Sequence, residues 1–343
     1  MKRVGILTGG GDAPALNAVI RGAVIRLARD GVASVGILEG WRGMLEKLSR
    51  DLSVDDVAGI VGEGGTVLGS SRTNPYKNPE RDLPKLVASY GALGLDALIA
   101  VGGDDTLGVA AKLHQGGSLN VVGVPKTIDN DLAATDYTFG FYTSVEIAMR
   151  AMDDLVSTAR SHRRVLVVEC MGRHAGWITG YAGLAAGADY VLVPEEKIDV
   201  EGLCRSLTAA RKRGKLYNIV AVAEGAEFGE EYVTQVADKD EFGHVRLGGV
   251  AEMLAKVITK KTGLESRHVV LGHLQRSGAP TAYDRVLGTR YGVFAAEMVL
   301  KGQFGKMAAL QGNEIRAVPL AEATGETKVL PKSFRELIKL FYA

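Results

Sequence analysis

Short runs of consecutive apolar residues, rich in valine, leucine and isoleucine, recur along the chain, and each is followed by a turn signal. These runs are residues 4–7, 34–38, 97–101, 121–124, 165–168, 190–193, 219–222 and 269–271. Continuous apolar runs, in contrast to alternating apolar and polar positions, are typical of parallel strands that are covered on both faces. The pattern therefore predicts two series of buried strands.

Helical patterns of apolar residues lie between the predicted strands. Residues 15–30 carry an apolar stripe that ends before Gly31, and residues 141–160 carry a longer one. Alternation of strands and helices predicts a doubly wound α/β architecture. We expect two mainly parallel, Rossmann-like sheet units, residues 1–140 and 141–343, with the active site in the cleft between them. Whether the C-terminal helices return to the first unit stays open.

The charge balance excludes several classes of function. The 343 residues include 41 Lys and Arg and 40 Asp and Glu, which leaves a formal net charge of +1. This balance excludes a general electrostatic binder of nucleic acid and provides no polybasic attraction to a membrane. No apolar stretch approaches the length of about 18 residues that a membrane span needs, so we expect a cytoplasmic protein. Cys170 and Cys204 are too few for a disulfide framework.

Glycine is over-represented, with 44 residues, nearly twice its average share. Three glycines form the turn at residues 9–11, between the first predicted strand and the next helix. Glycines let main-chain N–H groups approach an anion, and a helix N-terminus adds partial positive charge. A dinucleotide-binding turn would read G-x-G-x-x-G, but Pro14 takes the place of the third glycine. The turn favours a phosphate site, and a nicotinamide-dependent oxidoreductase, supported only by Glu39 after the second strand, is a remote alternative.

Two adjacent carboxylates follow the third predicted strand, in residues 102–106 (GGDDT) at the start of a helix. A single aspartate here would be read as a helix cap. Two acids beside a glycine pair are better explained by a hard cation, because Mg²⁺ prefers one or two carboxylates together with substrate phosphate oxygens. Asp104 is the candidate metal ligand.

A polar cluster, residues 125–131 (PKTIDND), follows the fourth predicted strand. Phosphoryl transfer needs positive charge on the moving group and a carboxylate that takes the proton from the attacking hydroxyl. Asp129 is the candidate base and Lys126 the candidate positive charge, with Thr127 between them. An Asx-turn at Asp129 and Asn130 is the alternative explanation.

Residues of the predicted second unit also follow strands. Arg173 and Glu224 come after its first and third strands, and His273 and Arg276 after its last. The arginine fork suits phosphate because it makes two parallel hydrogen bonds. Arg173, His273 and Arg276 are therefore candidates to hold a sugar phosphate, with Glu224 accepting hydrogen bonds from sugar hydroxyls.

Two other arginines, Arg164 and Arg267, stand just before predicted strands. They should lie at the opposite edge of their own sheet, because ligands of parallel sheets collect at the carboxyl ends of strands. They reach an active site only if another subunit presents that edge.

Six motifs stand in the order and spacing of the phosphofructokinase family, which the chain resembles over nearly its whole length. They are GGGD at residues 9–12, GGDDT at 102–106, PKTIDND at 125–131, MGR at 171–173, EG at 224–225 and GHLQR at 272–276. The resemblance implies transfer of a phosphoryl group to the 1-hydroxyl of fructose 6-phosphate, with Mg²⁺ as cofactor and fructose 1,6-bisphosphate as product.

The resemblance also implies the roles of individual residues. Asp129 is the base, Asp104 the Mg²⁺ ligand, and Gly11 and Arg72 contact the donor phosphates. The sugar-phosphate site comprises Thr127, Asp129, Asp131, Arg164, Met171, Gly172, Arg173, Glu224, Arg267, His273 and Arg276. Because the family lends two of these arginines across a subunit interface, Arg164 and Arg267 imply a homodimer or homotetramer.

Asp105 and Lys126 occupy the two positions that indicate which phosphoryl donor the enzyme uses. ATP-using relatives usually have glycine at both positions, and a carboxylate at 105 would meet the α-phosphate of ATP. Like charges at close range cost on the order of several kcal/mol in a partly dry site. The pair resembles the pyrophosphate-dependent branch, with Asp105 deciding, since some ATP-using relatives also carry the lysine. Trp41, where ATP-using relatives often stack tyrosine on the base, is ambiguous.

Two alternative functions stay open. An ATP-dependent 6-phosphofructokinase is the main alternative, and a non-catalytic sugar-phosphate sensor is disfavoured because binding alone needs neither a base nor a metal carboxylate.

Arg21, Lys215 and Asp189 stand where bacterial ATP-using relatives bind effectors between subunits, with Asp189 replacing a usual glutamate. We therefore expect weak or absent allosteric control.

Overall fold

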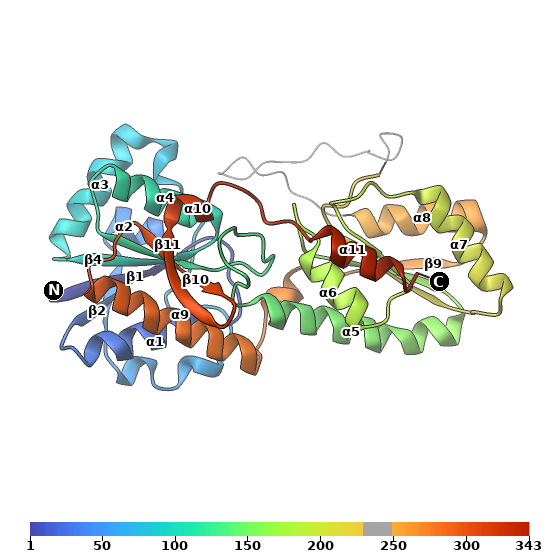
Figure 1. The fold of residues 1–343 in the computed structure, drawn as a ribbon, viewed down its shortest axis with the longest axis horizontal. Helices are drawn as coiled ribbons and strands as arrows, with labels where there is room; N and C mark the ends of the chain where they lie inside the picture. Colours follow the sequence, from blue (N-terminus) through green and yellow to red (C-terminus); the bar gives the residue numbers. More distant parts are fainter. Residues whose placement is uncertain (229–248, 343) are drawn as a thin grey trace.

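The structure, a computed structural model, describes residues 1–228 and 249–342. Within these residues the strands form two sheets, each covered by helices on both faces, and the two sheet units lie side by side along the long axis (Figure 1). The seven-stranded sheet has the order β11-β10-β5-β4-β1-β2-β3, and the four-stranded sheet has the order β7-β8-β6-β9. Only the pairs β2–β3 and β10–β11 of these sheets are antiparallel. The expected α/β fold with two mainly parallel sheets is confirmed.

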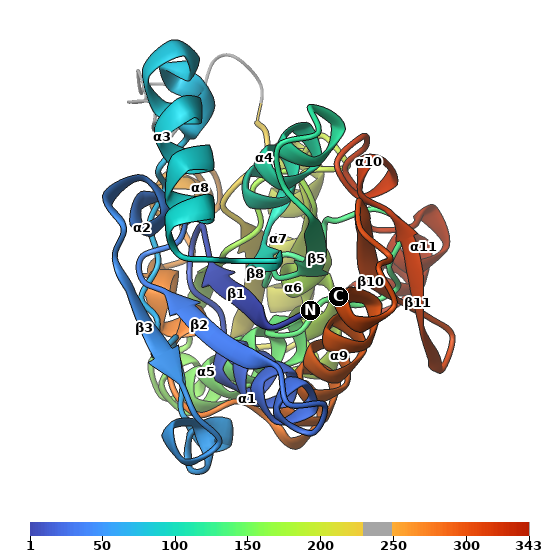
Figure 2. The ribbon, with the colours of Figure 1, turned by 90° about the vertical axis from the view of Figure 1, so that its left-hand side faces the viewer.

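The first unit is built on the seven-stranded sheet. Its strands are β1 (Arg3–Thr8), β2 (Ala33–Ile37), β3 (Ser49–Leu52), β4 (Ala97–Gly102), β5 (Val121–Pro125), β10 (Lys306–Gln311) and β11 (Glu314–Pro319). Its helices are α1 (Leu16–Ala28), α2 (Trp41–Glu46), α3 (Pro79–Ala92), α4 (Asp104–Gln115), α9 (Ala282–Leu300) and α10 (Leu320–Ala323), with short 3₁₀ helices η1 (Asp55–Val57), η2 (Ile60–Gly62) and η3 (Pro75–Lys77). Figure 2 shows α1 and α9 below the sheet and α3 and α4 above it.

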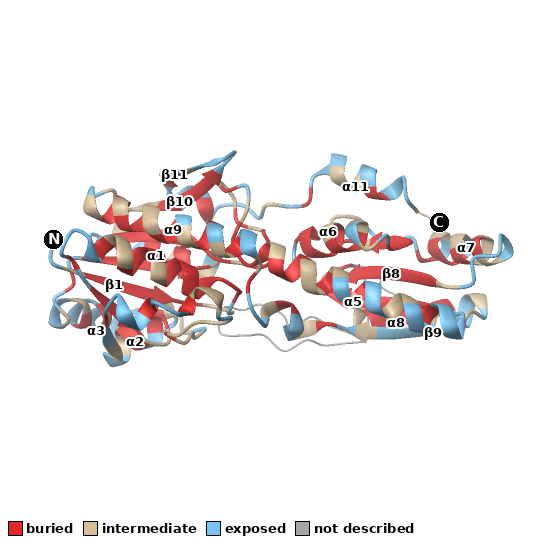
Figure 3. Ribbon diagram, turned by 90° about the horizontal axis from the view of Figure 1, so that it is seen from below, coloured by how far each residue is buried: buried red, intermediate tan, exposed pale blue. Residues whose placement is uncertain are grey.

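The second unit is built on the four-stranded sheet. Its strands are β6 (Val165–Cys170), β7 (Tyr190–Leu192), β8 (Asn218–Ala223) and β9 (Ser266–Val270). Its helices are α5 (Phe141–His162), α6 (Trp177–Ala185), α7 (Val200–Lys212), α8 (Val250–Thr262) and α11 (Lys332–Lys339), and the 3₁₀ helix η5 (Gly272–Arg276) follows β9. In Figure 3 the buried residues fill the central strands and the inward faces of the helices in both units, whereas the edge strand β9 is largely exposed.

The continuous apolar runs are buried along their whole length in the central strands. Every residue of β4, β5, β6 and β8 is buried. Removal of a valine, leucine or isoleucine side chain from water contributes about 1.5–3 kcal/mol, and in a strand buried on both faces such residues contribute on either face. This is the physical reason that these strands could be predicted from runs instead of alternation.

Helices α1 and α9 pack unusually closely against each other. A Cβ atom added at Gly292 would lie 2.1 Å from the main-chain oxygen of Val19, and one at Gly22 would lie 2.6 Å from that of Thr289. Only glycine permits such an approach of two helix backbones. Part of the glycine surplus therefore serves helix packing and not a ligand.

The sequence left open whether the C-terminal helices return to the first unit. Residues 282–323, which form α9, β10, β11 and α10, do return to it, and β10 and β11 extend its sheet, so residues 141–343 do not all belong to the second unit. The β10–β11 hairpin turns at Gly312, which has a φ of +62°. The pattern does not indicate these strands, because two of the four apolar residues of β10 are alanines, which are depleted in strands, and β11 is exposed at alternate positions as the sheet edge.

The last strand of the second sheet begins earlier than expected. β9 spans Ser266–Val270, so Arg267 is its second residue and does not precede it. The run was misplaced because β9 is an edge strand with exposed polar residues, which breaks the apolar pattern. Among the described residues, no helix is long and apolar enough to cross a membrane.

Candidate active site

The glycine turn lies between the ends of two neighbouring strands. Gly9 donates its N–H to the main-chain oxygen of Val101 at 2.9 Å, and Gly10 donates to that of Ser71 at 3.0 Å. Gly10 has a φ of +78°, a conformation that residues with a Cβ rarely adopt. The turn thus holds its backbone against the carboxyl end of β4, where the second predicted motif begins.

A cavity of about 280 Å³ lies where the two units face each other. Its wall is formed by residues that follow β1, β4 and β5 in the first unit and β6 and β8 in the second. The carboxyl ends of parallel strands are the usual position of ligand sites in open α/β sheets. The predicted site residues that line it are Gly11, Arg72, Asp104, Asp105, Lys126, Thr127, Asp129, Asp131, Arg173, Glu224 and Arg276.

Five predicted sugar-site residues do not line this cavity: Met171, Gly172, His273, Arg164 and Arg267. Met171 and Gly172 lie behind Arg173, where the Met171 N–H donates to Oε1 of Gln275 at 3.2 Å. His273 is exposed on η5. These residues support the wall or lie outside it in the single chain.

Arg164 and Arg267 lie away from the cavity, at the opposite end of the second sheet. Both form ion pairs with Glu265, at 2.8 and 2.7 Å. The two arginines are therefore held together by one carboxylate at the amino ends of β6 and β9, which agrees with the expected edge position.

Lys126 lies buried at the floor of the cavity, with 4% of its surface exposed. Its Nζ donates to the main-chain oxygen of Gly11. Burial, followed by the nearby Arg276, lowers the pKa of Lys126 to about 7, against the opposing effect of Asp12, Asp129 and Asp131. An anion in the cavity would restore the charged form, because it supplies the missing opposite charge.

Asp129 is the perturbed carboxylate of the cavity. Its Oδ1 atom is buried and has no hydrogen-bond partner, and its N–H donates to Oγ1 of Thr127 at 3.1 Å. Burial and the neighbouring Asp131 raise the pKa of Asp129 to about 7, while Arg276 and Arg173 lower it. A carboxylate with a pKa near neutrality is suited to accept a proton at physiological pH.

Glu224 faces Asp129 from the second unit. Burial raises the pKa of Glu224, and the Gly172 N–H, which donates to its Oε1 at 3.4 Å, opposes this effect. Two carboxylates with raised pKa values, a buried lysine and three arginines (Arg72, Arg173 and Arg276) thus share one cavity. Such perturbed groups cluster at functional sites, and the lysine and arginines can bind a phosphorylated ligand.

A model of the phosphofructokinase family matches residues 3–299. The chain belongs to the phosphofructokinase family. It is 56% identical over 99% of both chains to a protein of Amycolatopsis methanolica named pyrophosphate–fructose 6-phosphate 1-phosphotransferase. It is also 48% identical, over 96% of this chain and 96% of the relative, to a protein of Streptomyces coelicolor named ATP-dependent 6-phosphofructokinase 3.

Solved structures agree on the fold. A crystal structure of Pichia pastoris phosphofructokinase in the T-state matches 99% of this chain with a TM-score of 0.82 at 31% sequence identity. This chain corresponds to 38% of that longer one. The names of the two relatives give different phosphoryl donors. Overall similarity therefore does not identify the donor of this phosphofructokinase, and the residues of the cavity must be considered.

Trp41 offers no surface for a nucleotide base. It begins α2, is 2% exposed, and does not line the cavity. The ambiguity that the sequence left at this position is thereby removed, because a buried indole cannot stack on an adenine in the cavity.

Asp104 fits a magnesium site of the type expected. It is exposed at the start of α4 and lines the cavity next to Asp105. No group of three His, Cys, Asp or Glu side chains in the described part of the chain is arranged as a metal cluster. Mg²⁺ commonly needs only one or two protein carboxylates when substrate phosphates complete its coordination, so the residues present suit it.

The cavity includes residues that the sequence did not indicate. His174 follows Arg173, and residues 323–327 come from the end of α10 and the segment after it. Residues 323–327 carry no recognisable motif, and they reach the cavity through the return of the C-terminal chain to the first unit. Only the proximity of His174 to Arg173 offered a signal.

The expected effector residues are split between the units. Lys215 forms an ion pair with Asp189 in the second unit, whereas Arg21 lies on α1 in the first. The prediction of weak or absent allosteric control stays a prediction.

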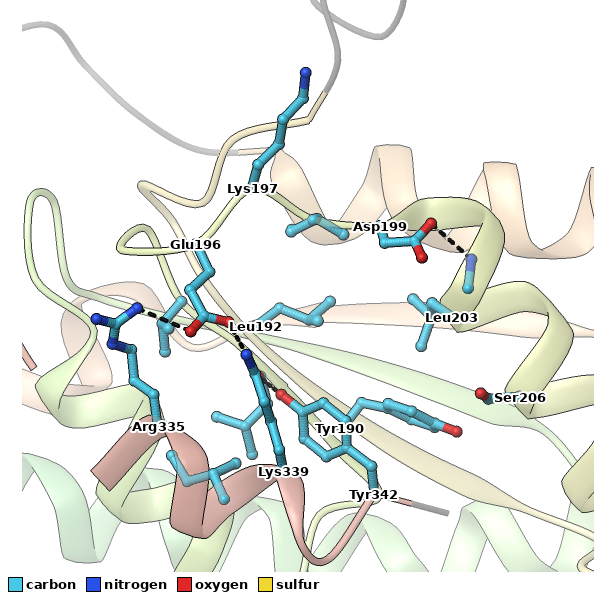
Figure 4. Close-up of a pocket in the computed structure, with 15 residues that line it drawn as sticks. Tyr190, Leu192, Glu196, Lys197, Asp199, Leu203, Ser206, Arg335, Lys339 and Tyr342 are labelled. Atoms are coloured by element: carbon cyan, nitrogen blue, oxygen red, sulfur yellow. Dashed lines mark hydrogen bonds and ion pairs between the residues drawn. The ribbon is translucent and has the colours of Figure 1, made fainter. Parts of the chain in front are cut away.

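A second cavity, of about 310 Å³, lies in the second unit between β7, α7 and α11. None of the predicted site residues lines it. Figure 4 shows Glu196 between Arg335 and Lys339, with contacts of 2.8 and 2.6 Å, while Lys197 points away. Glu196 is therefore already paired with two cations, which does not favour a catalytic role.

Proposed function

We propose that this phosphofructokinase transfers a phosphoryl group between inorganic pyrophosphate and fructose 6-phosphate. In the forward direction, the 1-hydroxyl oxygen of the sugar attacks one phosphorus of pyrophosphate, and the bridging P–O bond breaks. The products are fructose 1,6-bisphosphate and orthophosphate. Because the leaving group is orthophosphate instead of ADP, we expect the reaction to run readily in both directions.

The observation that carries the choice of donor is the position of Asp105. It lies beside Asp104 at the start of α4 and lines the same cavity as Gly11 and Lys126. A fixed carboxylate beside the donor phosphates repels the additional phosphate and nucleoside of ATP. Pyrophosphate lacks this additional phosphate and nucleoside and does not extend to Asp105, so it is the favoured donor.

The remaining donor contacts suit a short anion. Gly11, Arg72 and Lys126 line the first-unit side of the cavity. The absence of a side chain at Gly11 lets a phosphate approach the backbone there, next to the positive charges of Arg72 and Lys126. The burial of Trp41 also supports a donor without a base.

The sugar phosphate occupies the second-unit side in this proposal. Arg173 and Arg276 hold the 6-phosphate, and Glu224 accepts hydrogen bonds from sugar hydroxyls. Asp129 then takes the proton of the 1-hydroxyl as the oxygen attacks. Its raised pKa makes it a competent base near neutral pH.

Thr127 and Asp131 complete the wall around Asp129, and Lys126 neutralises the charge of the group in transit. Asp104 would hold Mg²⁺, which supplies positive charge to the phosphate oxygens when it is bound. The base, the lysine and the arginines act from fixed positions, so that orientation provides much of the rate enhancement.

The sugar site becomes complete only in an oligomer. Arg164 and Arg267 lie at the far end of the second sheet, held by Glu265, and cannot serve the cavity of their own subunit. We propose that a homodimer or homotetramer presents them to the sugar phosphate of a neighbouring subunit, together with His273. We expect this assembly to work in the cytoplasm, without nucleic acid or membrane partners.

The names of the relatives support a sugar-phosphate acceptor in either case, while an ATP-dependent enzyme is the alternative for the donor. The reverse reaction tests the proposal. Supplied with fructose 1,6-bisphosphate and Mg²⁺, the enzyme should release fructose 6-phosphate when orthophosphate is added and should form pyrophosphate in equal amount. An enzyme that responds only to ADP is ATP-dependent.

A further inference from the structure

A segment of the C-terminal chain crosses between the two units beside the cavity. We define residues 324–331 as the strap, which runs from α10 on the first unit to α11 on the second (Figure 1). Its first residues line the cavity. Farther along, the Leu330 N–H donates to Oε1 of Glu195 in the second unit at 2.7 Å. The strap is thus attached at both ends and faces the site between them.

Lys328 of the strap contacts the loop following Asp129, next to Thr327, which forms a β-bridge with Leu132. Its N–H donates to the main-chain oxygen of Asp131 at 2.8 Å. Its Nζ donates to Oδ1 of Asn130 at 3.0 Å and to the main-chain oxygens of Thr135 and Asp136 at 2.8 and 2.9 Å. All three hydrogens of the ammonium group therefore have an acceptor in one loop.

Two residues of this loop have a positive φ. Asn130, directly after Asp129, has a φ of +51°, which asparagine adopts more readily than other residues with a side chain, and Ala134 has a φ of +62°, which is uncommon. The Oδ1 atom of Asn130 also accepts the N–H of Thr138 at 3.1 Å. The ammonium group of Lys328 binds the same oxygen, so it stabilises the conformation that sets the direction of the neighbouring Asp129.

The opposite side of Lys328 contacts the second unit. Its Nζ lies 5.3 Å from the centroid of the Trp177 ring, and the Nε1–H of Trp177 donates to the main-chain oxygen of Lys328 at 2.8 Å. Trp177 begins α6 immediately after the loop that carries Arg173. One lysine therefore contacts both the loop of the proposed base and the helix next to a proposed phosphate ligand.

We propose that Lys328 is a positioning residue, which fixes the Asp129 loop of the first unit against the Arg173 segment of the second. The inference rests on the proposed function, in which these two residues act on one sugar phosphate. Misplacement of reacting groups by about 1 Å can cost about a hundredfold in rate. A tie between the two segments thus affects chemistry without touching substrate.

The charge of Lys328 is consistent with this role. Burial lowers the pKa of Lys328 to about 8, and Asp131 and Asp136 oppose the shift. The amine is therefore still mainly protonated at neutral pH. A buried ammonium group costs desolvation energy, which its three acceptors, the two aspartates and the Trp177 ring offset.

The test is Lys328→Met, which keeps the length of the side chain but removes its three donors. The concentration of fructose 6-phosphate binding sites is measured by calorimetric titration, and kcat is calculated per binding site. Unfolded protein therefore does not lower the value of kcat. We expect kcat per binding site to fall ten- to a hundredfold with the stoichiometry unchanged. Lys328→Arg, which restores charge and donors, should recover part of the rate.

The matched control is Lys112→Met. Lys112 also places its Nζ over an aromatic ring, 5.1 Å from the centroid of Tyr76, but it lies in the last turn of α4. This variant should keep the wild-type rate. A kcat per binding site of Lys328→Met within twofold of wild type would overturn the proposal.

A second variant applies if Lys328→Met does not fold. Trp177→Phe keeps an aromatic ring below the ammonium group and removes the hydrogen bond to the Lys328 oxygen. The proposal expects at least a threefold loss of kcat per binding site, and an unchanged value would overturn it. All rates are measured with the phosphoryl donor that the wild-type enzyme uses. If that donor is ATP instead of pyrophosphate, the wild-type assay shows it, and the test of Lys328 is unaffected.

Discussion

Arg276 of the second unit donates from Nη1 to the main-chain oxygen of Asp12, in the glycine turn of the first unit, at 2.9 Å. This hydrogen bond joins the proposed sugar side of the cavity to the proposed donor side. The guanidinium group also influences the pKa values of both Lys126 and Asp129. Arg276 therefore links the two halves of the site in geometry and in charge.

Gly11→Ala should disturb this link. A Cβ at Gly11 would lie 2.7 Å from Nη1 of Arg276, so the guanidinium group must move. We expect kcat/KM to fall at least tenfold for both substrates, because both halves of the site lose their alignment. Gly91→Ala, in the open surroundings of α3, is the control and should leave steady-state kinetics unchanged. Wild-type kinetics for Gly11→Ala would show that Arg276 acts on neither substrate.

Asp129→Ser removes the proposed base. General base catalysis contributes about 10²–10⁴-fold, so kcat should fall by that factor while calorimetry still detects fructose 6-phosphate binding. Asp153→Ser, at an exposed position of α5, serves as the control. Turnover above a tenth of the wild-type rate in Asp129→Ser would mean that another group takes the proton.

The pH dependence of kcat/KM should be bell-shaped with its maximum near neutrality. Asp129 must be deprotonated to act as a base, and its raised pKa of about 7 removes activity as the pH falls below that value. Lys126 must be protonated to attract phosphate, and its lowered pKa of about 7 removes activity as the pH rises above it. The steady-state rate measured from pH 5 to 9 checks both limbs.

Lys126→Arg separates the two limbs of this profile. A guanidinium group does not lose its proton in this range, so the alkaline limb should disappear while the acid limb stays. An alkaline limb that is unchanged in Lys126→Arg would assign it to a different group.

Mixing two inactive variants tests the shared sugar site. Asp129→Ser lacks the base, and Arg267→Ala lacks an arginine that we propose to serve the neighbouring subunit. In a hybrid oligomer, the site that combines Asp129 of one subunit with Arg267 of the other is intact. Co-refolded mixtures should recover activity that neither variant has alone, and a mixture as inactive as its components would place Arg267 outside the site.

The sequence predicted the central strands and the meeting point of the motifs well. β4, β5, β6 and β8 are buried on both faces, so their apolar runs carry an unambiguous signal. Because parallel strands end at a common edge, residues after separate strands could be expected to converge. Lys126, Asp129 and Arg173 do line one cavity.

The C-terminal part of the chain was not predictable in the same way. β11 and β9 are edge strands with exposed polar residues; β11 lacks a continuous apolar run, and the run at residues 269–271 covers only the end of β9. The strap, residues 324–331, carries no motif, and its contact with the Asn130 loop depends on the return of residues 282–323 to the first unit. Such long-range contacts are set by tertiary packing, which local patterns do not encode.

The choice of donor depends mainly on Asp105, and two variants separate its charge from its size. Asp105→Gly removes both and should raise kcat/KM for ATP, while Asp105→Asn removes only the charge. If repulsion excludes ATP, both variants should gain; if space does, only Asp105→Gly should gain. No gain in either would mean that ATP is excluded elsewhere in the cavity.

The most direct measurement compares kcat/KM of the wild-type enzyme for pyrophosphate and for ATP, with saturating fructose 6-phosphate and Mg²⁺. The proposal expects fructose 1,6-bisphosphate from pyrophosphate, with kcat/KM for ATP at least a hundredfold lower. Formation of fructose 1,6-bisphosphate from ATP alone would contradict the role assigned to Asp105 and identify an ATP-dependent phosphofructokinase.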